Sequence, residues 1–93
     1  MTVDTLRMTL AEDFIDKWER GQVTDSQFGS ELRKLRRRMR VTIEKLAGVS
    51  ELTMATISNV ERSVRPPRID TIEKLFRGLQ LIERQREDER MAP

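Results

Sequence analysis

The polar side chains of this 93-residue chain are suited mainly to forming hydrogen bonds and ion pairs, because the two residue types that most often serve as nucleophile, general base or metal ligand are missing. The chain has no cysteine and no histidine, which excludes disulfides and thiolate metal sites and removes the commonest general base. It also lacks a glycine-rich phosphate loop. Catalysis would have to rest on carboxylate pairs, a lysine or an activated serine, so we expect no enzyme, no metal and no cofactor.

Positive charge is concentrated in the middle of the chain. Residues 21–68 carry ten basic and five acidic side chains, net +5, whereas residues 1–20 carry three basic and five acidic, net −2. Residues 69–93 carry five basic and six acidic, net −1. A basic centre between acidic ends indicates a polyanion-binding middle, although charge runs are often no more than solvated helix faces.

The composition predicts that helices position these residues. Glycine and proline number only four and three, which disfavours a turn-rich β architecture. The length suits one domain over residues 1–93, with a core of aliphatic side chains, three Phe and one Trp. Apolar runs are too short to span a membrane, and residues 1–10 lack the pattern of a signal peptide. We therefore expect a cytoplasmic protein that makes no membrane contact.

Apolar spacing divides the chain into an acidic N-terminal helix, a central core and a polar tail. The segment 1–21 predicts an amphipathic helix over residues 4–20, ending before Gly21, whose stripe recurs every four residues: Leu6, Leu10, Phe14 and Trp18. A second helix is expected from a cap at residues 24–26 to about Arg40. Its inward residues would be Phe28, Leu32, Leu35 and Met39.

The remaining helices follow from threonine, aspartate and proline signals. Thr42 and Thr53 are expected to cap two short helices, and Asp70 a final one that reaches Ile82. Pro66 and Pro67 predict an extended loop between residues 65 and 68. The core thus covers residues 25–82. Residues 83–93 are expected to be a polar tail that stays helical for a turn or two and then frays.

The spacing of the two short helices resembles the helix-turn-helix of the phage-repressor-like (Xre, or lambda-repressor-like) family. The stretch TIEKLAGVSELTMATISNVER matches it without gaps, and RPPRIDTIEKLFRGLQL is similar to the family's final segment. The resemblance covers residues 28–81. It implies an all-α helix-turn-helix bundle of about five helices, here with an extra N-terminal amphipathic helix.

The turn between the short helices departs from the family pattern. Glu51 stands where glycine is usual, Ser50 where an apolar residue is usual, and Ser63 replaces a glycine further on. If Glu51 is left-handed, the strain is about 1–2 kcal/mol. The alternative is a helix that stops at Gly48 and a longer turn.

The resemblance implies that the second short helix reads bases in the major groove. The base-reading residues would be Met54, Ala55, Thr56, Ser58 and Asn59. The Asn59 amide can pair bidentately with adenine, and Met54 and Ala55 can contact thymine methyl groups. The alternative is that these residues are merely small and solvent-facing.

The resemblance also assigns backbone-contacting and structural residues. Phosphate contacts are expected at the helix starts marked by Thr42 and Thr53. They are also expected from three loop arginines, Arg62, Arg65 and Arg68. Arg68 is in addition a candidate for the minor groove. Arg36 is expected to form a structural ion pair with Glu61, which closes the reading helix.

The function implied is that of a dimeric repressor, of phage or restriction–modification controller type, on a near-palindromic operator in double-stranded DNA. The dimer interface is expected at Leu79, Leu81 and Ile82. Leu79 can face the core of one monomer, but Leu81 and Ile82 cannot both do so, and one of them is therefore left for a partner. The alternative is an antitoxin that also binds a partner toxin. The N-terminal helix would then hold the toxin instead of adding to the core or to the dimer interface. A third class is a protein-interaction module without DNA binding.

Overall fold

A computed structural model describes residues 8–91 and shows an all-helical protein, as predicted. Its five helices in chain order are α1 (Leu10–Glu19), α2 (Asp25–Arg38), α3 (Ile43–Ser50), α4 (Met54–Glu61) and α5 (Ile69–Met91). The described residues include no strand. None of these helices has the length and apolar character needed to cross a bilayer.

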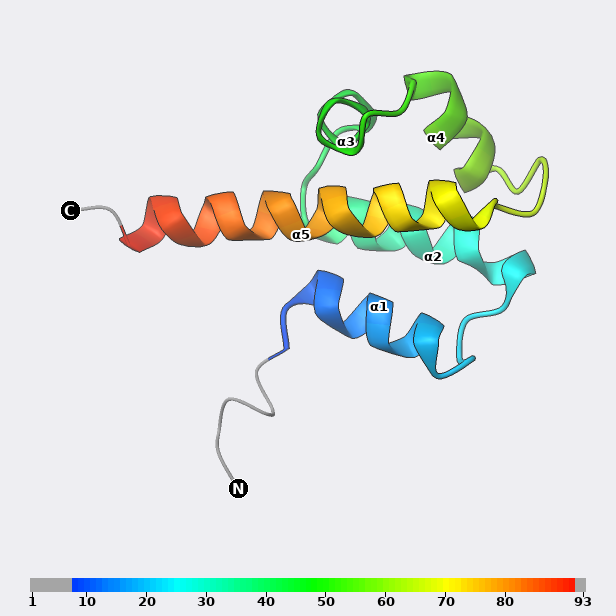
Figure 1. The fold of residues 1–93 in the computed structure, drawn as a ribbon, viewed down its shortest axis with the longest axis horizontal. Coiled ribbons are helices and arrows are strands. Elements are labelled where there is room, and N and C mark those ends of the chain that lie inside the picture. Colours follow the sequence, from blue (N-terminus) through cyan, green and yellow to red (C-terminus); the bar gives the residue numbers. More distant parts are fainter. Residues whose placement is uncertain (1–7, 92–93) are drawn as a thin grey trace.

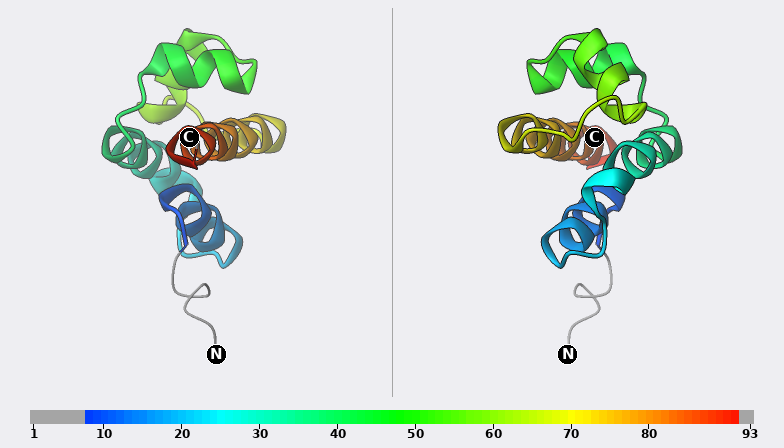
Figure 2. Two further views of the ribbon diagram at one scale, coloured as in Figure 1. Left: turned by 90° about the vertical axis from the view of Figure 1, so that its left-hand side faces the viewer. Right: turned by 90° about the vertical axis from the view of Figure 1, so that its right-hand side faces the viewer.

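Helix α5 is the longest helix, and it lies between the pair α3–α4 and α1 (Figures 1 and 2). Helices α3 and α4 lie on one side of α5 and α1 lies on the opposite side, which the end-on views make clear (Figures 1 and 2). Helix α3 packs mainly against α5, and α4 packs against α2 and α3. The short helix pair therefore rests on a platform made by α2 and α5.

The core is continuous from α1 to α4. The apolar side chains that the spacing assigned to the inside of α2 are all buried, and so are Leu46 and Ile57 of the short helices. An aromatic cluster joins α1 to this core: the Trp18 and Phe14 rings lie with their centroids 5.0 and 5.5 Å from that of Phe28. Helix α1 is therefore part of the same packed unit as the rest.

Helix α1 begins later than the predicted residue 4. The Thr9 hydroxyl accepts a hydrogen bond from the Glu12 backbone N–H, and the Glu12 carboxylate accepts one from the Thr9 backbone N–H. This reciprocal capping box starts the helix at Leu10. The predicted stripe thus keeps Leu10, Phe14 and Trp18, while Leu6 lies outside the described residues.

Helix α5 differs from the prediction at both ends. It begins at Ile69, and Asp70 lies inside its first turn, where the carboxylate accepts from the Thr71 N–H. It also continues through Met91, somewhat beyond the one or two turns of helix that were expected after Ile82. The Glu83 carboxylate accepts from the Ala11 backbone N–H at 3.1 Å, which fastens this half of α5 to α1.

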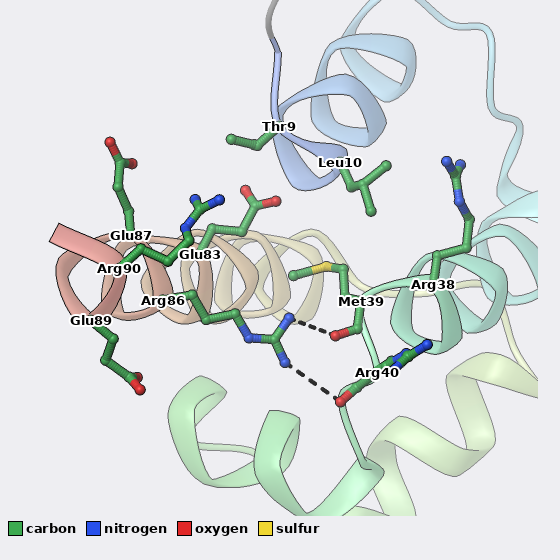
Figure 3. A pocket seen from close by; sticks show the side chains of 10 residues that line it. All are labelled: Thr9, Leu10, Arg38, Met39, Arg40, Glu83, Arg86, Glu87, Glu89 and Arg90. Carbon is green, nitrogen blue, oxygen red and sulfur yellow. Dashed lines mark hydrogen bonds between the residues drawn. The ribbon is translucent and has the colours of Figure 1, made fainter.

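Arg86 makes the second anchor of the C-terminal half of α5. Its guanidinium donates to the backbone carbonyl oxygen of Met39 at 2.5 Å and to that of Arg40 at 3.5 Å (Figure 3). These carbonyls lie just after the end of α2, where a cation also complements the helix dipole. The polar segment beyond Ile82 therefore holds the α2–α3 connection in place.

Candidate nucleic-acid interface

The turn between α3 and α4 is tight, and its left-handed residue is Glu51. Helix α3 runs to Ser50, and Glu51 follows with φ 57° and ψ 40°. The backbone N–H groups of Glu51 and Leu52 both donate to the carbonyl oxygen of Ala47, which closes the helix end. The alternative of a stop at Gly48 is wrong. Because Glu51 has a Cβ atom, this conformation costs about 1–2 kcal/mol.

Two glycines that the sequence analysis did not single out set the seat of this helix pair. A Cβ atom at Gly78 of α5 would lie 2.1 Å from the Ser50 hydroxyl, and one at Gly29 of α2 would lie 2.1 Å from the Val60 carbonyl oxygen. Helices α3 and α4 therefore approach their platform as closely as backbone allows. An isolated glycine inside a helical pattern is the signal that marks such contacts.

The expected pairing of Arg36 and Glu61 is present and is bidentate. The Arg36 Nε donates to Glu61 Oε2 at 2.7 Å and its second terminal nitrogen donates to Oε1 at 3.0 Å. The side chains are only 12% and 5% exposed. The hydrogen bond to Glu61 raises the pKa of Arg36 against the opposing effect of burial. Another Arg36 nitrogen donates to the Val41 carbonyl oxygen at 3.0 Å, so one guanidinium ties together α2, α4 and the connection to α3.

The five residues expected to read bases share the outer surface of α4. Met54, Ala55 and Asn59 are exposed, and Thr56 and Ser58 are half-buried. The Thr56 hydroxyl lies 2.8 Å from that of Thr53, and the Asn59 side-chain oxygen accepts from Arg62 at 2.9 Å. The surface therefore offers two apolar side chains, small polar groups and an amide, which is the chemistry of base-edge contact.

The loop between α4 and α5 brings its arginines to the same surface. A groove of about 340 Å³ runs between α4 and this loop. It is lined on one side by Thr56 and Asn59 and on the other by Arg65 and Arg68. Arg62, at the end of α4, is exposed next to it. Two of the base-reading candidates and two of the phosphate-contacting candidates thus line one groove.

The starts of α3 and α4 are both capped by a threonine. The Thr42 hydroxyl accepts from the Lys45 N–H, and the Thr53 hydroxyl accepts from the Thr56 N–H. Each cap occupies one backbone donor of a first turn, and the other first-turn donors of a helix are available to an anion. Thr42 and Thr53 are both exposed, so capping and phosphate contact are compatible at both positions.

Comparison with known proteins identifies this arrangement. A family model described as a helix-turn-helix domain matches residues 27–89, well over half of the chain. The chain belongs to this helix-turn-helix family. It is 45% identical over 51 residues to RghRB, an uncharacterized HTH-type transcriptional regulator of Bacillus subtilis (strain 168). The match covers 54% of this chain and 37% of that relative, and no solved structure matches.

Two of the three residues expected at the dimer interface, all on α5, lie in the core of the single chain. Leu79 and Ile82 are buried inside the single chain, so in this conformation neither side chain is accessible to a second copy. Leu81 is 38% exposed, which leaves it alone among the three for a partner. The physical reason is the helical period, which turns Leu81 away from the face shared by Leu79 and Ile82.

A second hollow lies apart from the helix-turn-helix groove. It has a volume of about 620 Å³ and lies between the start of α1, the end of α2 and the C-terminal half of α5 (Figure 3). Its walls carry charges of both signs, including Arg38, Arg90, Glu83 and Glu87. The described residues contain no group of acidic side chains arranged to hold a metal ion.

Proposed function

We propose that this protein is a transcriptional regulator that binds specific sequences in double-stranded DNA, with α4 in the major groove. The observation that carries the proposal is the groove in which Thr56 and Asn59 of α4 face Arg65 and Arg68 of the following loop. The relative's description as an HTH-type transcriptional regulator supports the same function.

The proposed interface divides into two kinds of contact. Met54, Ala55, Thr56, Ser58 and Asn59 contact base edges and so supply specificity. The helix starts at Thr42 and Thr53 bind backbone phosphates, and so do the exposed arginines Arg62, Arg65 and Arg68. We assign Arg68 to the side of the minor groove. The buried pair of Arg36 and Glu61 touches no DNA and holds α4 at its angle to α2.

We further propose that the regulator is a dimeric repressor on a near-palindromic operator. One module of this size contacts few base pairs, and two copies on a twofold axis present one reading helix to each half-site. The exposed Leu81 on α5 is the side chain that we place at the contact between copies. The resemblance to phage repressors and restriction–modification controllers favours repression by occupancy of the operator.

The antitoxin alternative rested on the apolar stripe of the N-terminal helix. In the structure Ala11 and Phe14 of α1 are buried, and Trp18 lies with its ring centroid 5.0 Å from that of Phe28. Leu10 and Trp18 are half-buried and pack against the same core. The described part of the stripe therefore packs against the protein's own helices, and we favour the regulator over the antitoxin.

The test is the salt dependence of binding to DNA fragments selected from a random library. The affinity is expected to fall steeply with salt, with a log–log slope of about −0.9 for each phosphate contacted. Arg65→Ala should reduce the magnitude of this slope by about one and weaken all sequences alike. The absence of DNA binding at low salt, or an affinity that does not change with salt, would refute the proposal.

A further inference from the structure

The last turn of α4 holds an amide and a guanidinium in direct contact. One terminal nitrogen of Arg62 donates to the side-chain oxygen of Asn59 at 2.9 Å. The two residues are three positions apart, which places them on one side of the helix end, and both are exposed. The donor carries a full charge, so this is the stronger class of hydrogen bond. Asn59 is therefore presented to a ligand together with Arg62.

The contact changes what the Asn59 amide offers. A free amide presents one acceptor and two donor hydrogens. Here the acceptor oxygen faces a cation, while the amide nitrogen and the remaining guanidinium N–H groups are still free to donate. A second donor that approached the same oxygen would also approach the positive guanidinium. The pair is therefore a set of donors that suits a surface of acceptors.

The surroundings of the pair have the same character. The groove beside it is lined by Arg65, Arg68, prolines, threonines and valines, and none of the described lining residues carries a carboxylate. The neighbouring outer residues of α4, Ala55 and Ser58, are uncharged. The lining of this groove therefore offers no carboxylate acceptor to a base amino group.

The base pairs differ in this respect in the major groove. Guanine presents two acceptors, N7 and O6, whereas adenine presents the acceptor N7 beside the donor N6 amino group. We propose that Asn59 and Arg62 act as one reading unit that selects guanine, in preference to the adenine that a free asparagine amide fits. This moves Arg62 from the phosphate contacts to the base-reading contacts. The inference rests on the proposed function, since it requires α4 to lie in the major groove.

The experiment selects bound fragments from a random double-stranded library with the full chain and three variants. The position read by Asn59 is defined as the one that Asn59→Ala relaxes. At that position the unsubstituted protein should prefer guanine over adenine by about tenfold, within the range of one bidentate contact. Arg62→Ala should remove most of that preference or turn it toward adenine, because the amide oxygen is then free to accept.

Arg65→Ala is the matched control, because it removes one positive charge from the same groove and leaves the pair intact. It should lower affinity for all fragments and keep guanine at the position read by Asn59. All three substituted side chains are exposed, so helical content by circular dichroism should not change. Adenine at this position in the unsubstituted protein, or a guanine preference that survives Arg62→Ala, would overturn the inference and leave DNA binding standing. The absence of binding by any form would overturn the proposed function with it.

Discussion

At the residue scale, the pair of Arg36 and Glu61 joins the end of α4 to α2. A buried ion pair repays its desolvation only when its geometry is good, and here two bonds of 2.7 and 3.0 Å join the same two groups. The Arg36 side chain is 12% exposed and the Glu61 side chain 5%, so the loss of either partner leaves the other as an uncompensated buried charge. The pair is therefore a point at which α4 can be detached from α2 by a single substitution.

Single substitution of this pair should be far more damaging than double substitution. Arg36→Met and Glu61→Met should each lower the free energy of unfolding by about 3–5 kcal/mol, whereas the double variant should lose less than either single variant. Urea denaturation of the four forms measures this. Losses of about 1 kcal/mol or less from the single variants would contradict burial, because that is the behaviour of an exposed pair.

Glu51 is a second residue with a local effect on stability, and its replacement by glycine should make the protein more stable. Its φ of 57° is costly for a residue with a Cβ atom, and its side chain is exposed. Glu51→Gly should raise the free energy of unfolding by about 1 kcal/mol, since the relieved strain exceeds the backbone entropy that glycine loses. Thermal denaturation measures the change.

The matched control for Glu51 is the same substitution inside α3. Glu44 is exposed in the first turn of that helix, with helical backbone. Glu44→Gly should lower stability by about 0.5–1 kcal/mol, because glycine disfavours a helix. Equal signs at the two positions would show that left-handed strain at Glu51 is not the cause.

At the scale of elements, the position of α3 depends on its close contact with α5. Gly78→Ala should lower the free energy of unfolding by about 1–3 kcal/mol, although alanine favours helix, because the new Cβ would lie 2.1 Å from the buried Ser50 hydroxyl. Chemical denaturation measures the loss. Ser50→Ala removes that hydroxyl, so the double variant Gly78→Ala, Ser50→Ala should recover most of the stability.

Gly48→Ala is the control for this contact. A Cβ atom at Gly48 would meet nothing within 4 Å, and the residue lies within α3. The substitution should therefore stabilise the protein by up to about 1 kcal/mol through helix propensity alone. If Gly78→Ala also stabilised the protein, the proposed steric seat of α3 on α5 would be wrong.

The same elements show which parts of the structure can be predicted from sequence. Periodic spacing placed the inner face of α2 correctly, and Thr42 and Thr53 mark the starts of α3 and α4 because capping is a local signal. The roles of Gly29 and Gly78 depend on contacts between helices, which no period records. The segment of α5 beyond Ile82 is anchored to Ala11 and Met39. These contacts join residues that are distant in sequence, so local sequence signals do not predict them.

The candidate site divides in the same way. The identity of the outward residues of α4 follows from the family spacing, and so does the partner of Arg36. The contact between Asn59 and Arg62 depends on side-chain conformations at a helix end, which spacing does not specify. The burial of Ile82 in place of Leu81 depends on how α5 is rotated against its neighbours, and the sequence alone left that choice open.

At the scale of the whole molecule, the proposed dimer depends on a face of α5 that the monomer leaves uncovered. Leu81 is 38% exposed, and Leu79 and Ile82 beside it are buried in the core. A charged residue at position 81 should therefore block association without unfolding the monomer. A charge at position 82 would enter the core and should unfold it, since burying an unpaired charge is costly.

The last prediction separates these two roles. Leu81→Glu should remain helical and sediment as a monomer where the unsubstituted protein sediments as a dimer. Its operator affinity should fall steeply, because two half-sites one turn of B-DNA apart, about 34 Å, are then bound by separate molecules. Ile82→Glu should instead lose cooperative unfolding. Placing the charge on another exposed face of α5, as in Gln80→Glu, controls for charge alone and should keep the dimer. If the unsubstituted protein is a monomer at micromolar concentration and binds one copy per site, the dimeric arrangement is wrong.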